Sequence, residues 1–216
     1  MLRNSLAVGP VGCNCTVVVC PVTREALVVD PGGDAGKILA LLTKMNARAV
    51  GIVLTHGHFD HILGTREVAA ATGAPVSIHG GDLDMYQGLV RQARYFDLMA
   101  EQPPEPAQIL AGGEILSFGQ LRALVLHTPG HTPGSVGLFI EAPGEVPVLL
   151  AGDTLFEGGI GRTDFPGGSS QQILRSIRDT LFLLPNETVV VAGHGPETTI
   201  GEERENNPYV GRRASH

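Results

Sequence analysis

Four side chains of types that commonly bind transition metals stand within six residues, in the segment Thr55-His56-Gly57-His58-Phe59-Asp60-His61. Imidazole and carboxylate groups are the ligands that zinc and iron accept most readily. His56 and His58 are two residues apart, so in an extended segment they point the same way and can share one ion. Asp60 and His61 stand where a helical pattern begins, so the chain has turned and they can address a second ion. We therefore predict a two-metal site.

Each of these residues has an ordinary structural explanation when it is taken alone. Asp60, just before a helical pattern, is typical of a helix N-cap, and histidines at a strand end are often surface residues. A cap needs no His-x-His in front of it, however. The four residues together therefore favour the metal site over the structural explanations.

Three later apolar stretches also end in residues of ligand type. The first is followed by a Pro/Gly loop that carries His131, the other two finish with Asp153 and with His194, and a glycine directly precedes each of these three residues. Glycine lets the backbone crowd around a small site, and loops on a rigid scaffold usually carry function. Three histidines and a shared carboxylate would complete the shell of one ion. An aspartate, two histidines and the same carboxylate would complete the other.

The order His-x-His-x-Asp-His, then His, then Asp, then His resembles the metallo-β-lactamase-fold hydrolases over essentially the whole chain. The segment from Thr55 to His61, His127-Thr128-Pro129-Gly130-His131-Thr132-Pro133-Gly134-Ser135 and Gly161-Arg162-Thr163-Asp164-Phe165-Pro166-Gly167-Gly168 are most similar to short, single-domain glyoxalase II-type enzymes. The resemblance implies two divalent metal ions, with zinc expected and iron or manganese as alternatives. It assigns metal 1 to His56, His58 and His131, and metal 2 to Asp60, His61 and His194, with Asp153 bridging.

The apolar patterns predict an α/β fold in which strands and covering helices alternate. Strands are expected near 14–20, 26–29, 49–55, 76–79, 114–117, 121–127, 135–140, 147–151 and 188–192, and helices near 34–45, 61–72, 81–98 and 171–184. This order suggests two facing sheets flanked by helices, within a single domain over residues 1–216. The αβ/βα sandwich with two mixed sheets, which the resemblance implies, is compatible with it. Pattern alone does not separate that sandwich from other α/β folds.

Composition bounds the partners and the compartment. The net charge is −7 and no block of Lys or Arg occurs, which argues against a nucleic-acid partner. No apolar stretch reaches 18 residues, and Pro10 interrupts the N-terminal segment too soon for a signal-peptide core. We therefore expect a cytoplasmic enzyme that acts on a small molecule without a membrane partner. Its oligomeric state stays open.

The three cysteines, Cys13, Cys15 and Cys20, stand in one early segment and are odd in number. A disulfide framework is therefore not expected. A Cys-x-Cys metal site is one interpretation of the first two. Because the segment has the pattern of a strand, we favour small core residues in a reducing compartment.

Several other polar residues have two interpretations. Asp30 precedes Pro-Gly and is typical of a turn, or it accepts a hydrogen bond from a ligand imidazole. His79 and His127 are expected to be structural, with His127 alternatively supporting a ligand. Arg162 and Asp164 either pair with each other, or Arg162 binds an anionic group of the substrate.

A two-metal site of this kind suits hydrolysis. Two divalent ions that share a water lower its pKa from about 15.7 towards ~7, which makes hydroxide available at neutral pH. We expect Asp153 to hold the ions together and Asp60 to bind metal 2 and orient the hydroxide. A thioester suits the site because its leaving thiolate belongs to an acid of pKa roughly 8.5 and departs without a protonating side chain.

The leading hypothesis is therefore that a metal-bridging hydroxide cleaves a 2-hydroxyacyl thioester of a small thiol, such as lactoylglutathione. Full-length glyoxalase II enzymes add a helical C-terminal domain with basic residues for glutathione, whereas 22 residues follow His194 here, so the thiol stays open. One alternative is a persulfide dioxygenase with a single iron, which carries a stretch similar to 161–165. Another is a lactonase or β-lactamase on the same site. A non-catalytic metal-binding module is disfavoured because a structural site is closed and four-coordinate.

Overall fold

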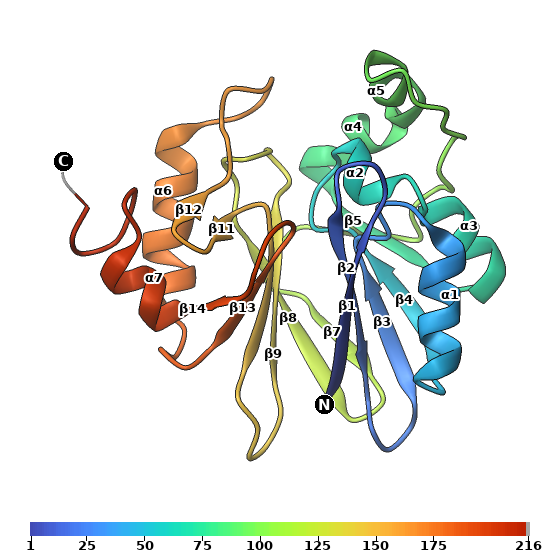
Figure 1. The fold of residues 1–216 in the computed structure, drawn as a ribbon, viewed down its shortest axis with the longest axis horizontal. Helices are drawn as coiled ribbons and strands as arrows, with labels where there is room; N and C mark the ends of the chain where they lie inside the picture. Colours follow the sequence, from blue (N-terminus) through green and yellow to red (C-terminus); the bar gives the residue numbers. More distant parts are fainter. Residues whose placement is uncertain (215–216) are drawn as a thin grey trace.

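Two six-stranded mixed sheets face each other in the computed structural model, which describes residues 1–214 (Figure 1). The terminal His216 lies outside these described residues. The first sheet has the order β1 (Leu2–Val8), β2 (Cys13–Val19), β3 (Glu25–Val29), β4 (Arg48–Val53), β5 (Val76–His79) and β6 (Gln108–Leu110). The second has the order β14 (Thr198–Thr199), β13 (Val189–Ala192), β10 (Val148–Gly152), β9 (Val136–Glu141), β8 (Leu121–His127) and β7 (Ile115–Phe118).

Helices cover the outer face of each sheet, so the predicted αβ/βα sandwich is confirmed (Figure 1). On the first sheet these are α1 (Ala35–Lys44), α2 (Phe59–Ile62), α3 (Thr65–Thr72), the 3-10 turn η1 (Gly80–Asp82), α4 (Leu83–Gln87) and α5 (Leu89–Tyr95). On the second they are α6 (Ser170–Asp179), the 3-10 turn η2 (Leu181–Leu183) and α7 (Ile200–Asn206). A small hairpin of β11 (Leu155–Phe156) and β12 (Gly159–Ile160) follows β10.

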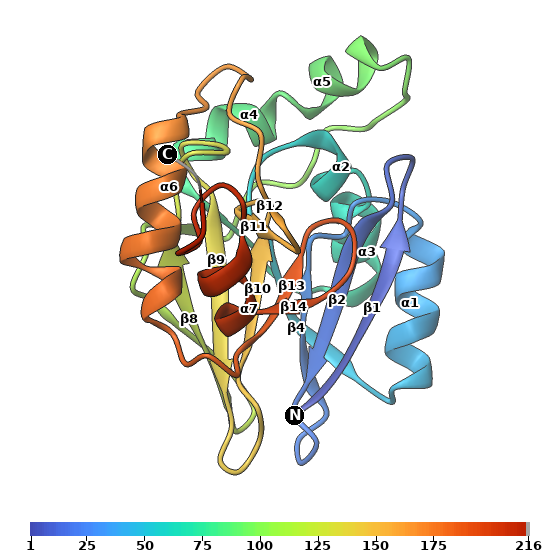
Figure 2. The same ribbon diagram turned by 60° about the vertical axis from the view of Figure 1, so that its left-hand side comes forward.

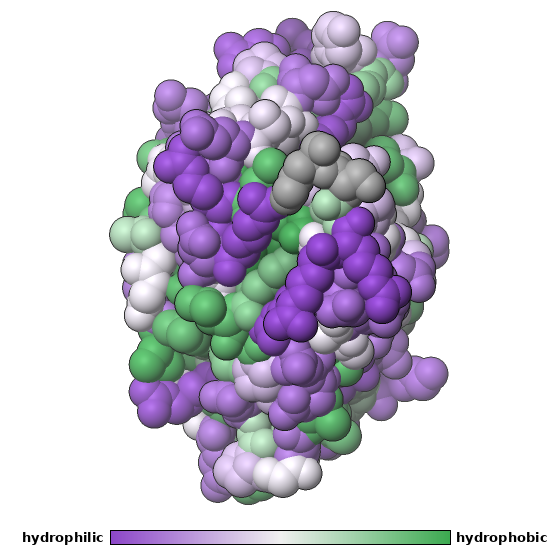
Figure 3. All heavy atoms as spheres, turned by 90° about the vertical axis from the view of Figure 1, so that its left-hand side faces the viewer, coloured by the Kyte–Doolittle hydropathy of each residue, from purple (hydrophilic) through white to green (hydrophobic). Residues whose placement is uncertain are grey.

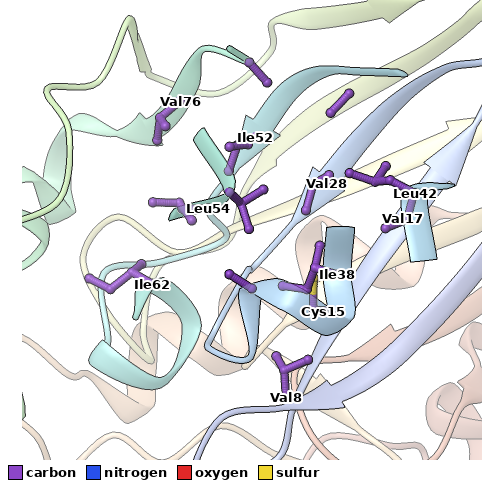
Figure 4. Close-up of a cluster of buried hydrophobic side chains, with 14 of the residues drawn as sticks. Val8, Cys15, Val17, Val28, Ile38, Leu42, Ile52, Leu54, Ile62 and Val76 are labelled. Atoms are coloured by element: carbon purple, nitrogen blue, oxygen red, sulfur yellow. The ribbon is translucent and has the colours of Figure 1, made fainter. Parts of the chain in front are cut away.

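Apolar side chains fill three layers of core. Between the first sheet and its helices, Ile38 and Leu42 of α1 pack against Val28 and Ile52 of the sheet (Figure 4). Between the two sheets lies a second core, which includes Leu27 and Leu138. A third core joins the second sheet to α6 and α7. The central strands therefore bury both faces, which explains their continuous apolar runs in the sequence.

The helices on the two outer faces differ in position, because one of them extends past the sheets. In both ribbon views α5 projects beyond the ends of the sheets (Figure 1, Figure 2). On the face that α6 and α7 cover, hydrophilic side chains surround a band of apolar ones (Figure 3). Among residues 1–214, none of the helices has the length and apolar character that a membrane crossing requires.

Most predicted elements are present. The main differences are helices interrupted near a glycine and short strands at the edges of the sheets. The helix expected over 61–72 is two helices, because α2 ends at Ile62 and Gly64 begins α3. The stretch 81–98 is divided at Gly88. The helix expected over 171–184 ends at Asp179 and continues as η2. Both β1 and β6, at the edges of the first sheet, were not predicted.

One strand end differs from the prediction, and one N-cap side chain bonds elsewhere. β4 ends at Val53 instead of continuing to 55, so His56 lies in a bend after the strand, whereas His58 has extended backbone angles and stands at the N-cap of α2. Asp34 occupies the N-cap position of α1, but its side chain makes no cap hydrogen bond. That carboxylate instead accepts from Gly9 N–H and from Lys37.

Candidate metal centre

Seven side chains converge where strands of the two sheets end. The bend after β4 and the following α2 carry four of them, and the loops after β8, β10 and β13 carry one each. All four strands contribute from their C-terminal ends, the edge of an α/β sheet at which ligands usually bind. The seven residues are His56, His58, Asp60, His61, His131, Asp153 and His194, the set that the sequence analysis selected.

The ligand-type atoms form two separate groups of three, and a third group of His56, His61 and Asp153 links them. His56, His58 and His131 make one group, and Asp60, His61 and His194 make another, with atoms within 4.8 Å of one another in each. In the first group His58 Nδ1 lies 2.9 Å from His131 Nε2. In the second group His194 Nε2 lies 3.1 Å from an Asp60 oxygen and 3.3 Å from His61 Nε2.

The carboxylate of Asp153 faces both groups. Its Oδ2 lies 3.6 Å from His131 Nε2 and 3.8 Å from His194 Nε2, and its Oδ1 lies 3.4 Å from His61 Nε2. Asp153 therefore stands between the two sets of ligand-type atoms, where one carboxylate could contact two ions.

Hydrogen bonds behind the imidazoles direct their lone pairs into the centre. His61 Nδ1 lies 2.9 Å from Asp30 Oδ2, and His131 Nδ1 lies 2.8 Å from the Arg162 carbonyl oxygen. Both partners are acceptors, so each Nδ1 carries the proton and each Nε2 is left with its lone pair. Thr55 Oγ1 donates to Asp30 and so can accept from His56 Nδ1 at 3.1 Å. Metal-binding histidines usually have partners of this kind.

Two buried atoms of the centre have no hydrogen-bond partner among the described residues, and both suit a cation. They are His56 Nε2 and Asp153 Oδ1. A buried polar atom without a partner costs about 1–3 kcal/mol, so native structures rarely leave one. A divalent ion would satisfy both atoms. The set of imidazoles and carboxylates also matches what zinc and iron accept, so the residues present fit the predicted ions.

The protonation states of most ligand residues are those that a metal requires. Burial, together with the neighbouring imidazoles, holds the pKa of His56 well below 6.5 and lowers the pKa of His58 to about 4. Burial acts to raise the pKa of Asp153, but the charge of His61, together with those of His131 and His194, outweighs it and the pKa is about 2. His61 and His194 differ: the charges of Asp153 and Asp30 outweigh the burial of His61 and raise its pKa well above 6.5, and the hydrogen bond to Asp60 raises the pKa of His194. A bound ion would displace these protons.

Asp30 is both a turn residue and an acceptor behind the centre. It adopts a left-handed backbone conformation with φ of 52° before Pro31. Its Oδ1 accepts the Thr55 N–H at 2.7 Å, and its Oδ2 accepts from the Thr55 hydroxyl at 2.6 Å and from His61. Asp30 therefore has both roles that the sequence offered as alternatives, the turn residue and the acceptor for an imidazole.

Sequence reasoning missed Asp82, a buried carboxylate in η1. Its Oδ2 accepts from Gly57 N–H at 2.8 Å and from the Thr132 hydroxyl at 2.6 Å, and its Oδ1 accepts from Gly134 N–H at 2.7 Å. These bonds join the bend that carries His56 and His58 to the loop that carries His131. In the sequence, nothing distinguishes the buried Asp82 from the exposed Asp84 two residues later.

Among the described residues, His79, His127 and the three cysteines join no group of ligand-type atoms. His79 and His127 stack on each other, with ring centroids 4.2 Å apart. The three cysteines are free and buried, as expected. Cys13 Sγ, however, lies 3.5 Å from His61 Nδ1, a contact that the sequence did not indicate.

A pocket of about 750 Å³ opens onto the centre. Its floor includes His58, Asp60 and Asp153, and its sides are mainly aromatic and aliphatic. Arg162 lines it too, and its guanidinium donates twice to Asp164, each time at 2.7 Å. The structure therefore contains the Arg162–Asp164 pair of one interpretation, and also places Arg162 beside the centre.

Comparison with known proteins agrees with this geometry. The sequence profile of the metallo-beta-lactamase superfamily matches residues 8–194. Hydroxyacylglutathione hydrolase GloC of Haemophilus influenzae is 37% identical over 195 residues, which cover 88% of this chain and 90% of that protein.

Solved structures with the same fold cover nearly the whole chain. The B3 metallo-beta-lactamase BLEG-1 superposes with a TM-score of 0.88 and 34% identity, over 97% of this chain and 99% of that one. TTHA1623 in a di-iron-bound form gives 0.85 and 36%, over 95% and 99%. ETHE1 from Myxococcus xanthus gives 0.80 and 27%, over 97% and 84%.

Proposed function

Because the chain belongs to the metallo-beta-lactamase superfamily, we propose that it is a metal-dependent hydrolase that cleaves thioesters of small thiols, of which lactoylglutathione is one. The observation that carries the proposal is the position of Asp153, whose two oxygens face both groups of ligand-type atoms. The similarity to GloC, a hydroxyacylglutathione hydrolase, supports the thioester as substrate.

His56, His58 and His131 would hold one ion, Asp60, His61 and His194 the other, and Asp153 both. When bound, two divalent ions supply a Lewis acid for the substrate carbonyl and lower the pKa of a water ligand towards ~7. Zinc is the expected metal, with iron and manganese as alternatives. The di-iron-bound form of TTHA1623 supports a site for two ions and keeps iron in consideration.

The carboxylate of Asp60 is suited to orient the attacking water. Burial acts to raise its pKa, but the hydrogen bond from His194 and the charge of His61 keep that pKa below 3.8. Asp60 is therefore ionised at neutral pH and acts only as an acceptor. A second oxygen, not engaged by His194, can accept a hydrogen bond from the water and hold its lone pair towards the substrate.

Arg162 is the lining cation and therefore the group suited to meet a carboxylate of the substrate. The apolar walls of the pocket would cover part of a bound thioester beside the centre. The leaving thiolate needs no acid because its conjugate acid has a pKa of roughly 8.5.

The test combines elemental analysis of the purified protein with thiol release from a panel of thioesters that includes lactoylglutathione. We expect two metal ions per chain and hydrolysis that stops when a chelator removes them. Asp153→Asn serves as the site variant and the exposed Asp84→Asn as its matched control. A fully metallated protein that hydrolyses no thioester would contradict the proposal.

A mononuclear iron persulfide dioxygenase is the second candidate, and the similarity to ETHE1 fits it. Such an enzyme holds a single iron through two histidines and an aspartate and leaves positions open for oxygen. One iron per chain, with oxygen uptake and sulfite formation from a persulfide, would favour it. A lactonase or β-lactamase on the same site would cleave its own ester or lactam in the same assay format.

A further inference from the structure

One wall of the pocket is a cluster of aromatic rings. Phe59 and Phe96 stack with centroids 4.5 Å apart, and Tyr95 meets Phe96 edge to face at 5.2 Å. Phe59 comes from α2, whereas Tyr95 and Phe96 stand at the end of α5, which projects beyond the sheets (Figure 2). Tyr95 is 84% exposed and Phe96 47%, so these rings have surface left for a ligand to cover.

A second wall comes from the loop that follows β12. The ring of Phe165 lies 5.5 Å from the ring of His58, so an apolar face reaches directly to the metal centre. The Arg162 guanidinium stacks over the Phe165 ring at 3.9 Å. Val11 and Phe156 add further apolar surface to the lining.

Few hydrogen-bond donors remain available to a ligand in this pocket. The Gln92 amide donates to the carbonyls of Gly57 and Met85, so both of its N–H groups are used. Arg162, the one Lys or Arg among the lining residues, is bonded twice to Asp164. The hydrogen bond from Arg162 lowers the pKa of Asp164 to about 2. Asp164 is thus ionised and offsets the charge of Arg162.

A glutathione conjugate carries two carboxylates, and each needs donors or cations. The pocket offers one offset guanidinium and the Tyr95 hydroxyl for both. The pocket offers a large aromatic surface, and covering such a surface with an apolar group of a ligand favours binding. Resting on the proposed thioesterase function, we propose that the site selects thioesters whose acyl group is aromatic or bulky and apolar, and that it does not require a charged thiol.

The test compares thioesters that differ in one feature at a time. Mandeloyl and lactoyl thioesters of N-acetylcysteamine differ by a phenyl in place of a methyl group, and lactoylglutathione differs from the latter in its charged thiol. Each kcat/KM is divided by the rate constant for alkaline hydrolysis, which removes intrinsic reactivity. We expect the mandeloyl compound to be preferred by about tenfold or more, as for apolar groups in apolar pockets. Lactoylglutathione should gain no more than a few-fold over its uncharged counterpart, the share that one offset guanidinium can supply.

Phe96→Ala should lower the mandeloyl-to-lactoyl preference about fivefold, because it removes a ring of the wall. Tyr209→Ala, at an exposed aromatic outside the pocket lining, is the matched control and should keep the preference. A corrected preference near one, or a tenfold preference for lactoylglutathione, would overturn the inference and leave the thioesterase function standing.

Thioether analogues separate the two proposals further, since they lack the carbonyl and only bind. S-(2-phenylethyl)-N-acetylcysteamine should raise the melting temperature of the metal-loaded protein more than the S-ethyl analogue does. If no thioester is hydrolysed but this difference appears, the thioesterase function fails while the pocket's apolar selectivity stands. Equal shifts would overturn the selectivity.

Discussion

Replacing Asp82 by asparagine tests whether one buried carboxylate fixes the two loops that carry His58 and His131. Asp82 accepts three hydrogen bonds, from Gly57, Thr132 and Gly134. Asparagine offers one acceptor oxygen and turns the other into a donor. In its better orientation the oxygen keeps the two bonds at the Oδ2 position, and the NH2 group faces the N–H of Gly134.

The expected loss of unfolding free energy follows from that orientation of the asparagine. One buried N–H without a partner costs about 1–3 kcal/mol, and the two remaining bonds lose the added strength of a charged acceptor. The free energy of unfolding should therefore fall by about 3 kcal/mol. For a chain of this size that corresponds to a melting temperature lower by about 6–12 °C. Because both joined loops carry ligand residues, metal affinity should fall about tenfold as well.

The assay is thermal unfolding of the metal-free protein, followed by competition of the protein with a chelator for zinc. Asp84→Asn makes the same chemical change two residues away at an exposed position and should stay within about 0.5 kcal/mol of the parent. If Asp82→Asn behaves like Asp84→Asn, the hydrogen bonds do not stabilise the loops. If stability falls but zinc affinity does not, Asp82 supports the fold without positioning the site.

Four further outcomes are expected. Asp153→Ala should remove bound metal and activity together, and an active, fully metallated variant would refute the bridging role. Gly193→Ala should abolish metal binding in a folded protein, since its Cβ would lie 2.1 Å from Asp153 Oδ1 and 2.6 Å from His61 Cε1; normal zinc stoichiometry would show that the centre adapts. Arg162→Ala should raise KM for lactoylglutathione a few-fold, about 0.5–1 kcal/mol as for exposed ion pairs, with less effect on kcat; an unchanged KM would assign Arg162 to the loop's structure. The folded protein keeps His58 neutral down to about pH 4, whereas the unfolded chain protonates it near 6.5. Protonation of His58 therefore favours the unfolded state, and its contribution to the unfolding free energy of the metal-free protein should fall by up to about 3 kcal/mol as pH drops from 6.5 to 4. Unfolding curves of His58→Gln should lack that share of the pH dependence, and an identical dependence would contradict the assignment.

The residues that converge at the centre could be selected from the sequence because each follows an apolar strand. A strand's C-terminal end is fixed by its own pattern, so the approximate position of His131, Asp153 and His194 needs no knowledge of the rest of the chain. The geometry of His56 and His58 could not be predicted in the same way. Their strand ends at Val53, and a bend set by contacts with Asp30 and Asp82 orients them.

The features that could not be predicted from the sequence depend on contacts between residues far apart in the chain. Asp82 resembles its exposed neighbour until Thr132 and Gly134 reach it from 50 and 52 residues away. The edge strand β6 is only three residues long, so its pattern is too short to recognise. The apolar character of the pocket likewise arises from α2, α5 and the loop after β12, which are separate in the sequence.

The centre draws its donors from both layers, since His56 to His61 follow the first sheet and His131, Asp153 and His194 follow the second. The distance between the residues from the first sheet and those from the second depends on how the two sheets pack together, through core side chains such as Leu27 and Leu138. Under the proposed two-ion site, the distance between the two groups therefore depends on a core that contains none of their residues. We expect a change of side-chain volume in that core to change the affinity for different divalent ions while every ligand-type residue is kept.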